Sequence, residues 1–364
     1  MNETVASEPA SFQTTLNLPA GFRMPAEWEP HSGTWLAWPH EESDWPGKLA
    51  AIPWVYAEII RHLHRHEQVQ LLVNNSANES AARDALNKAG VDLNRVSFYT
   101  WSTDRVWTRD SGPTFLLGPN DQKGLLDWRF NAWAKYPNWQ NDDAIPLHVA
   151  YVTGYPMWRP VWNGRRIVLE GGSIEVNGCG LLLTTEECLL SDVQCRNPGM
   201  SRADYERVFA DYLGVKKVLW LNRGIAGDDT HGHIDDLARF VAPRRVVTVV
   251  ESNPAEENYV PLQVNLDRLR GMADVDESKL EVIPLPMPAP VVFDGQRLPA
   301  SYANFYIANG LVLVPTFNDV NDRKALGILA ELFPDREVVG IHAVDLVYGL
   351  GTLHCMTQQE PASD

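Results

Sequence analysis

The chain places four polar turns at nearly even intervals along its length. Asp110 and Glu170 are 60 positions apart, Glu170 and His233 are 63 apart, and His233 and Cys355 are 122 apart, close to twice 61. A repeated unit of strands and a helix would give this spacing if each unit placed its polar turn at a common centre. The spacing therefore predicts one pseudo-symmetric domain, over residues 18–364, rather than two separate domains.

Strand and hairpin patterns accompany these turns. Asn-Gly pairs at 177–178 and 309–310 are typical of tight turns that join two antiparallel strands. Helical periodicity alternates with short β-rich runs, which predicts an α/β fold. Helices are expected at residues 54–64, 78–89, 202–213, 259–272 and 322–333, and strands at 69–73, 95–99, 217–221, 245–250, 281–283, 311–314 and 337–341. Hairpins are expected within 169–185, 232–250 and 301–315, and a fourth hairpin is expected to begin at 109–117.

The ends of the chain and its cysteines indicate where it works. Residues 1–17 lack a basic stretch followed by an apolar run, so we interpret them as a flexible arm rather than a secretion signal. The polar tail at 358–364 is expected to fray. Four cysteines without an export signal favour free thiols in the cytoplasm, and the absence of a Cys-x-x-Cys pair argues against a structural zinc site.

Charge restricts the class of partner. The chain has 31 basic and 47 acidic residues, a formal net charge of −16. Nucleic acids and anionic membranes need a basic face, so we expect neither as a partner. No stretch approaches the roughly 18 apolar residues of a membrane span. The charge is compatible with a cationic substrate.

A cysteine close to the end of the chain presents a choice. Cys355 closes the run Gly-Leu-Gly-Thr-Leu-His-Cys at 349–355, where two glycines allow close approaches and the alternation suggests a strand end. Such a cysteine is either a small buried hydrophobe or a nucleophile. We interpret Cys179 and Cys188 as structural or incidental, and Cys195 as a loop residue.

The segment at 227–236 is unusually rich in aspartate and histidine. His233 and Asp235 are two positions apart and would share one face of a strand, as a catalytic pair would. The same segment also fits a metal site made by His231, His233, Asp228 and Asp235. A structural polar network is a third interpretation.

Two more polar turns carry carboxylates. Asp110 follows Trp107 in a Trp-Thr-Arg-Asp-Ser-Gly-Pro run, where it is either functional or a turn residue, and Trp107 either lines a pocket or packs in the core. Glu170 ends an apolar run before two glycines, so it is either a solvated turn carboxylate or a buried one that needs a positive partner. Serine-hydrolase, phosphate-loop and dinucleotide signatures are missing.

Together these motifs resemble the agmatine deiminases, in the bacterial peptidylarginine-deiminase-type branch of the guanidine-modifying (pentein) superfamily. The resemblance rests on the segments at 24–39, 109–114, 169–173, 184–189, 232–235 and 353–359. It implies a five-bladed α/β propeller with pseudo-fivefold symmetry and a central active site.

Roles follow from the resemblance by position. Cys355 would be the nucleophile and His233 the general acid and base. Asp110 and Asp235 would grip the guanidinium, and Glu170 would support both the guanidinium and His233. Trp107 and Gly351 would line the substrate pocket. Carboxylates near Cys355 would raise its pKa in the empty enzyme, and a bound cation would reverse this.

The resemblance implies hydrolysis of agmatine, a small cationic guanidine, to N-carbamoylputrescine and ammonia, through an S-alkylthiouronium on Cys355. This is a step of putrescine biosynthesis and needs no cofactor or metal. A homo-oligomer is also expected. The alternatives are another guanidine, such as peptidyl-arginine, and a metal-dependent hydrolase built on His231 and His233.

Two departures from the family concern the substrate tail. Agmatine deiminases commonly carry Gly-Gly-Gly-Asn-Ile-His-Cys, whereas this chain has Leu350 and Thr352 at the second and fourth of those positions. His231 stands where many members have asparagine. These differences leave the core chemistry intact and bear on specificity.

Overall fold

The computed structural model describes residues 18–363, and five of its sheets share one pattern. In each, one strand pairs antiparallel with one neighbour and parallel with the other. The sheets are β20 (Gln358–Pro361), β1 (His31–Ala37), β2 (Gln68–Val73) and β3 (Val96–Thr100); β4 (Thr114–Leu117), β5 (Lys123–Leu126) and β6 (Met157–Trp158); β9 (Glu175–Val176), β10 (Leu181–Thr185) and β11 (Lys217–Leu221); β12 (Ala238–Ala242), β13 (Arg245–Val250) and β14 (Glu281–Pro286); and β17 (Tyr306–Ala308), β18 (Leu311–Thr316) and β19 (Glu337–His342).

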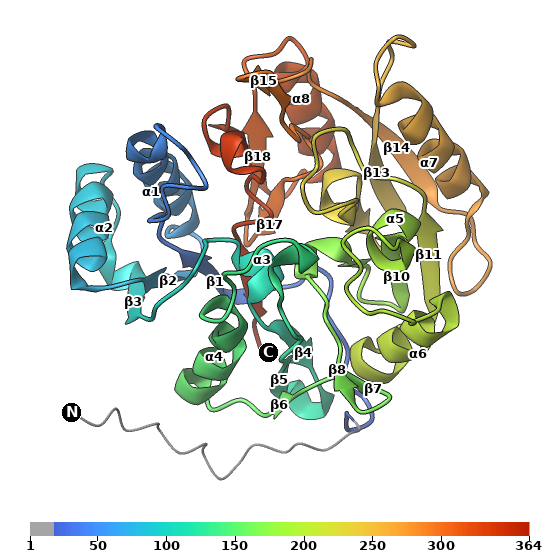
Figure 1. Cartoon of the computed structure of the whole chain (residues 1–364), viewed down its shortest axis with the longest axis horizontal. Coiled ribbons are helices and arrows are strands. Elements are labelled where there is room, and N and C mark those ends of the chain that lie inside the picture. Colours follow the sequence, from blue (N-terminus) through green and yellow to red (C-terminus); the bar gives the residue numbers. More distant parts are fainter. Residues whose placement is uncertain (1–17, 364) are drawn as a thin grey trace.

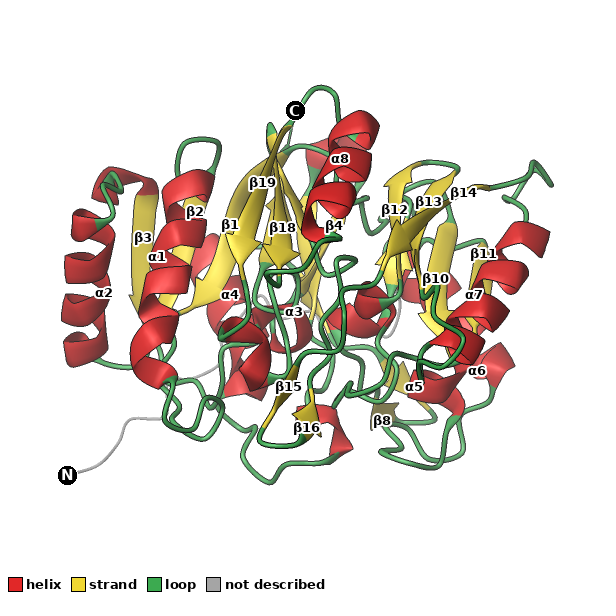
Figure 2. Cartoon of the chain, turned by 90° about the horizontal axis from the view of Figure 1, so that it is seen from above, coloured by secondary structure: helices red, strands yellow, loops and turns green. Residues whose placement is uncertain are grey.

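Each parallel pair is joined through at least one α-helix, as parallel strands require a crossover. These helices lie toward the outside of the molecule, and the strands lie nearer its middle (Figure 1, Figure 2). Two short hairpins, β7 (Val161–Trp162) with β8 (Arg165–Arg166) and β15 (Val292–Phe293) with β16 (Gln296–Arg297), complete the sheets. The crossover helices are α1 (Ile52–Leu63), α2 (Ser76–Lys88), α4 (Ile145–Thr153), α5 (Glu186–Leu190), α6 (Arg202–Leu213), α7 (Tyr259–Gly271) and α8 (Asp322–Leu332).

The mixed α/β class, the five predicted helices, the seven predicted strands and the four hairpins are confirmed. The sequence patterns missed α4, which is apolar on most sides, and β1, which is buried along most of its length. None of the helices within residues 18–363 is both long and apolar enough to cross a membrane. The arm predicted at 1–17 lies outside the described residues.

Two expectations about the end of the chain are wrong. The tail predicted to fray forms β20, which pairs antiparallel with β1 and is buried. Its polar side chains have buried partners; Gln359, for example, accepts a hydrogen bond from Arg109 Nη1 at 2.7 Å. Cys355 lies in a tight turn between the 3-10 helix η8 (Leu346–Gly349) and β20, instead of at a strand end.

The common sheet pattern brings the polar turns together. The short helix α3 (Thr108–Ser111) precedes β4, η6 (Gly171–Ser173) precedes β9, η7 (Ile234–Asp236) precedes β12, and the turn of Cys355 precedes β20. Asn304 occupies the corresponding place before β17, inside the double interval between His233 and Cys355. In Figure 1, α3 and β17 lie near the centre with the sheets around them.

Candidate active site

The Cys355 thiol is fixed by a single amide. Asn304 Nδ2 donates to Cys355 Sγ at 3.1 Å, and Asn304 Oδ1 accepts from Thr352 Oγ1 at 2.7 Å and from the backbone N–H of His354 at 3.0 Å. Cys355 is 6% exposed, so its thiol is reached only through a narrow opening. Thr352, a departure from the family, therefore orders the loop of the thiol.

Burial raises the pKa of the Cys355 thiol well above its usual range. The carboxylates of Asp235, Asp236 and Asp110 raise it further, because each opposes a second negative charge nearby. Cys355 Sγ lies 3.7 Å from Asp235 Oδ2. This agrees with the expectation from the sequence and means that the empty site stabilises the neutral thiol.

His233 is buried in the middle of three carboxylates. Its Nδ1 lies 3.8 Å from Asp110 Oδ1 and 4.0 Å from Asp235 Oδ1, and its Nε2 lies 3.8 Å from Glu170 Oε2. Burial alone would lower the pKa of His233, but the charge of Asp110, with Cys188 and Glu170, raises it well above its usual value. The site therefore favours an imidazolium that can donate a proton.

Asp110 is held on α3 by two donors. Trp133 Nε1 donates to Oδ2 at 2.8 Å, and the backbone N–H of Gly172 donates to Oδ1 at 2.9 Å. Burial raises the pKa of Asp110 to about 6; the positive charge of His233 opposes this shift, and the charges of Asp235 and Glu170 add to it. Asp110 therefore favours a bound cation.

The glycine at position 172 is required by this crowding. A Cβ atom there would lie 2.5 Å from His233 Nδ1 and 2.8 Å from Asp110 Oδ1. The Glu-Gly-Gly motif thus lets the backbone donate to Asp110 without filling the space between the catalytic candidates.

Glu170 has the positive partner that its burial demands. Arg196 Nε donates to Glu170 Oε1 at 3.1 Å, and both side chains are fully buried. Burial would raise the pKa of Glu170, but Arg196 and His233 together lower it to about 2. Glu170 is therefore an ionised support for His233 at neutral pH.

Asp235 is pinned at one oxygen and free at the other. His354 Nδ1 lies 2.8 Å from Asp235 Oδ2, and burial, which would raise the pKa of Asp235, is outweighed by the bond and charge of His354. The remaining oxygen, Oδ1, has no hydrogen-bond partner in the part of the chain that the structure describes. This leaves one carboxylate oxygen available to a ligand.

We call Asp110, Glu170, His233, Asp235 and Cys355 the reactive cluster. Four of its buried atoms have no hydrogen-bond partner among residues 18–363: both ring nitrogens of His233, Glu170 Oε2 and Asp235 Oδ1. Buried polar atoms are nearly always paired, so such a concentration indicates a place for a polar ligand.

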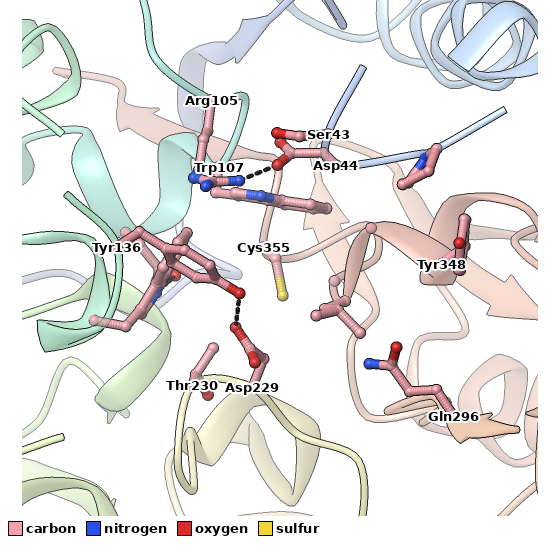
Figure 3. Close-up of a pocket in the computed structure, with 16 residues that line it drawn as sticks. Ser43, Asp44, Arg105, Trp107, Tyr136, Asp229, Thr230, Gln296, Tyr348 and Cys355 are labelled. Atoms are coloured by element: carbon pink, nitrogen blue, oxygen red, sulfur yellow. Dashed lines mark hydrogen bonds and ion pairs between the residues drawn. The ribbon is translucent and has the colours of Figure 1, made fainter. Parts of the chain in front are cut away.

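A cavity of about 400 Å³ leads to this cluster (Figure 3). Gly351 lies against its wall, where a Cβ atom would come within 2.7 Å of the Trp107 ring. Leu350, rather than either glycine, adopts the left-handed conformation, at φ 69°. The lining residues are Ser43, Asp44, Pro46, Arg105, Trp107, Asp110, Trp133, Tyr136, Asp229, Thr230, Gln296, Tyr348, Gly349, Leu350, Gly351 and Cys355.

The cavity contains the predicted Trp107, Asp110, Gly351 and Cys355, whereas Glu170, His233 and Asp235 are fully buried beside it. Three of its lining residues form ion pairs: Arg105 with Asp44, and Asp229 with Lys135. In Figure 3, Asp229 and Asp44 lie on opposite sides of Cys355, and Asp229 accepts a hydrogen bond from Tyr136 Oη at 2.8 Å.

The residues of the metal-site alternative do not converge. His231 Nε2 contacts Ser191 Oγ at 3.0 Å, and Asp228 accepts backbone N–H groups of its own loop. Within residues 18–363, two other groups bring ligand atoms within 4.8 Å of one another: Glu170, Cys188 and His233, and Glu27, Glu175 and His354. Arg196 binds a carboxylate of the first group, and Arg239 binds both carboxylates of the second.

Sequence reasoning missed several supporting side chains: Asn304, Arg196, Trp133, His354 and Glu27. Asn304 could have been found, because the double interval between His233 and Cys355 calls for one more polar turn. The burial of Glu170 called for a positively charged partner, but the sequence did not indicate that Arg196 supplies it. Cys188, interpreted as structural or incidental, contacts His233 closely enough to affect its pKa.

Comparisons with known proteins show the family of the chain. The sequence matches the family of Porphyromonas-type peptidyl-arginine deiminases over residues 23–361. An agmatine deiminase of Pseudomonas aeruginosa (strain LESB58) is 35% identical over 94% of this chain and 96% of the relative.

Solved structures give the same result. The agmatine deiminase of Enterococcus faecalis has a TM-score of 0.88 at 33% identity, covering 94% of this chain and 97% of its own. A cysteine-to-serine variant of the C. jejuni agmatine deiminase with substrate bound has a TM-score of 0.84 at 27% identity, covering 94% and 97%.

Proposed function

The chain belongs to the family of Porphyromonas-type peptidyl-arginine deiminases, and from this premise we propose that it hydrolyses agmatine to N-carbamoylputrescine and ammonia. The observation that carries the proposal is the reactive cluster, a buried thiol among a histidine and three carboxylates with four unpartnered polar atoms. A guanidinium cation has the charge and the N–H groups to satisfy such carboxylates. The agmatine deiminases among its relatives support this substrate.

Binding would fix the plane of the guanidinium. Asp235 Oδ1 and the Asp110 carboxylate accept its N–H groups, while Trp107 and Gly351 form the wall beside it. Glu170, held by Arg196, keeps His233 in place. The central carbon is thereby presented to Cys355.

In the first half of the reaction, the Cys355 thiolate forms a bond to the guanidinium carbon. The bond from this carbon to one terminal nitrogen then breaks, and His233 donates the proton with which ammonia departs. An S-alkylthiouronium remains on Cys355.

In the second half, water attacks the same carbon. His233, now neutral, takes one proton from the water as its oxygen bonds to the carbon. The carbon–sulfur bond then breaks to release the thiolate, and the new hydroxyl group loses its proton to solvent as the ureido carbonyl forms. The sum is agmatine, as its guanidinium cation, plus water giving N-carbamoylputrescine plus ammonium. These steps use only side chains and water.

The charge of the substrate would also generate the nucleophile. The pKa of Cys355 is raised by burial and by Asp235, Asp236 and Asp110. A bound guanidinium neutralises those carboxylates and stabilises the thiolate. Substrate binding and thiol ionisation are therefore one coupled event, in which the thiol proton passes to solvent because His233 is already protonated.

Peptidyl-arginine is the second candidate, because the matched family takes its name from that substrate. The cavity runs from the buried Cys355 to the exposed Gln296, so the tail of the guanidine points outward. Leu350 and Asp229, which forms an ion pair with Lys135, line this path and would distinguish a free amine from a peptide.

The fold and the biological role are proposed on the same basis. The five sheets of common pattern support a five-bladed propeller with pseudo-fivefold symmetry, in one domain over residues 18–364. N-carbamoylputrescine formation would place the enzyme in putrescine biosynthesis.

Ammonia release from agmatine, arginine and an arginyl peptide tests the proposal, with Cys355→Ala and the exposed-thiol control Cys179→Ala. We expect agmatine to be turned over fastest, Cys355→Ala to be inactive and Cys179→Ala to match the wild type. Turnover of another guanidine but not agmatine would refute the substrate. Full activity of Cys355→Ala would refute the mechanism.

A further inference from the structure

His354, next to the nucleophile, bridges two buried carboxylates. Its Nδ1 lies 2.8 Å from Asp235 Oδ2, and its Nε2 lies 2.7 Å from Glu27 Oε2. A neutral imidazole has one N–H, so one of these contacts would set a lone pair against a carboxylate oxygen. Both contacts are favourable only if both ring nitrogens carry hydrogen.

Arginines complete the surroundings of Glu27. Arg239 Nη2 lies 2.7 Å from Glu27 Oε2, Arg239 Nε lies 3.0 Å from Glu175 Oε2, and Arg109 Nη2 lies 3.5 Å from Glu27 Oε2. We call Glu27, Arg109, Glu175, Arg239 and His354 the anchoring cluster. All five are at most 5% exposed.

When Glu27, Glu175 and Asp235 are all ionised, a positive His354 ring balances the charges that face it. Glu27, Glu175 and Asp235 supply three negative charges, and Arg109 and Arg239 supply two positive charges. Cys355 and Asp236 stand beyond Asp235. A protonated His354 brings this buried group to neutrality, which the low dielectric of the interior favours.

Resting on the proposed function, we propose that His354 is a positioning residue: as an imidazolium anchored on Glu27, it holds Asp235 so that Oδ1 faces the guanidinium. Because His354 occupies Asp235 Oδ2, the free Oδ1 is the atom presented to the site. The same positive charge lies beside the oxygen nearest Cys355 Sγ, at 3.7 Å, and offsets its repulsion of the thiolate.

Two isosteric variants separate positioning from general structural support. In His354→Asn the amide nitrogen replaces Nδ1 and can donate to Asp235, whereas in His354→Gln it replaces Nε2 and can donate to Glu27. Each variant loses the positive charge and leaves one carboxylate without its donor, so urea unfolding should show similar losses of stability. A purely structural role predicts equal losses of activity.

We expect kcat/KM for the guanidine to fall roughly tenfold in His354→Asn and at least about 100-fold in His354→Gln, since only the latter frees Asp235. Equal losses in the two variants at equal stability would overturn the proposal.

Two readouts do not need turnover. In the ¹⁵N NMR spectrum of the wild type, both ring nitrogens of His354 should carry hydrogen at neutral pH; a neutral ring would overturn the proposal. Alkylation of Cys355 by iodoacetamide, followed on its own peptide by mass spectrometry, should need a higher pH in both variants, because each has lost a nearby positive charge. An unchanged pH dependence of alkylation would show that the charge of His354 does not stabilise the Cys355 thiolate.

If the wild type turns over none of the guanidines, the proposed function fails, yet the NMR spectrum and the alkylation profiles still decide whether His354 is a protonated bridge. The two failures are thus distinguishable.

Discussion

The molecule contains two adjoining clusters of buried charge that differ in one respect. In the anchoring cluster, each carboxylate oxygen of Glu27 and Glu175 and each ring nitrogen of His354 has a partner. In the reactive cluster, His233, Glu170 and Asp235 contribute four atoms without partners. The two clusters are alike in their burial and in their density of charge, so neither property identifies a binding site.

Unsatisfied polar atoms make the difference. A saturated ionic network fixes a structure, because removing any member leaves an uncompensated charge. An unsaturated one is less stable by itself and gains stability from a ligand that supplies the missing contacts. Changes in the reactive cluster should therefore cost mainly activity, and changes in the anchoring cluster should cost mainly stability, except at His354, which also contacts Asp235 of the reactive cluster.

Asp110→Asn should give the largest effect on activity. It removes a negative charge that binds the guanidinium, and we expect kcat/KM to fall on the order of 1,000-fold. Stability should change little near pH 7, as measured by urea unfolding, because relief of the buried charge is offset by an amide nitrogen that faces one of the two donors, Trp133 Nε1 or the Gly172 N–H.

The relief of the buried charge follows from the pKa of Asp110, which is raised to about 6. A carboxyl group whose pKa is raised on folding binds its proton more tightly in the native state. Its contribution to stability therefore falls as pH rises from about 4 through 6, and the neutral amide removes this penalty. A large loss of stability in Asp110→Asn would contradict the contrast between the clusters.

Arg239→Met should give the largest effect on stability. It leaves the buried Glu27 and Glu175 without their common partner, so we expect the free energy of unfolding to fall by about 3–5 kcal/mol. Arg245→Met on the neighbouring strand is the control, since its partly exposed pair with Glu281 should contribute less than about 1 kcal/mol. Similar urea midpoints for the two variants would show that the anchoring cluster does not hold the fold.

Gly172→Ala tests the space inside the reactive cluster. The added methyl group would displace His233 and Asp110, so we expect a loss of about 100-fold in kcat/KM and about 1–3 kcal/mol in stability. Gly271→Ala, where a Cβ meets no atom within 4 Å, is the matched control and should be neutral or slightly stabilising. Full activity in Gly172→Ala would mean that the cluster is looser than its contacts indicate.

A ligand should lower the pKa of the Cys355 thiol, which burial and carboxylates raise in the empty site. Thiolate absorbance, taken as the difference from Cys355→Ala, should move to lower pH by at least about one unit when a guanidinium ligand binds, equivalent to about 1.4 kcal/mol. No movement would mean that the unpartnered atoms are not filled by a cation.

Much of the fold could be predicted from local patterns. The helices at α6 and α8 follow apolar periodicity, and the hairpin at Asn309–Gly310 follows turn chemistry. Strand β20 could not be predicted, because its glutamines are polar and its burial depends on Arg109 and β1, which lie far away in the sequence.

The same limit applies to the site. The spacing of Asp110, Glu170 and His233 indicated a shared centre, because chemistry-bearing turns recur once per unit. Arg196 and His354 could not be given roles, since a buried ion pair is specified by three-dimensional neighbours rather than by any local pattern. The double interval between His233 and Cys355 did, however, indicate one further polar turn, and Asn304 occupies it.

Leu350→Asn should give the smallest effect. Because Leu350 lines the cavity without belonging to either cluster, this variant is the reference for the activity and stability changes of the cluster variants. Its φ of 69° is unfavourable for leucine by about 1–2 kcal/mol, and asparagine tolerates it better. The lost packing of a half-buried leucine costs about 1 kcal/mol in the other direction. We therefore expect urea unfolding to change by less than about 1 kcal/mol, and kcat to be unchanged. A rise in KM for agmatine without a change in kcat would place Leu350 against the substrate tail, and specificity would then depend on the rim rather than on the reactive cluster.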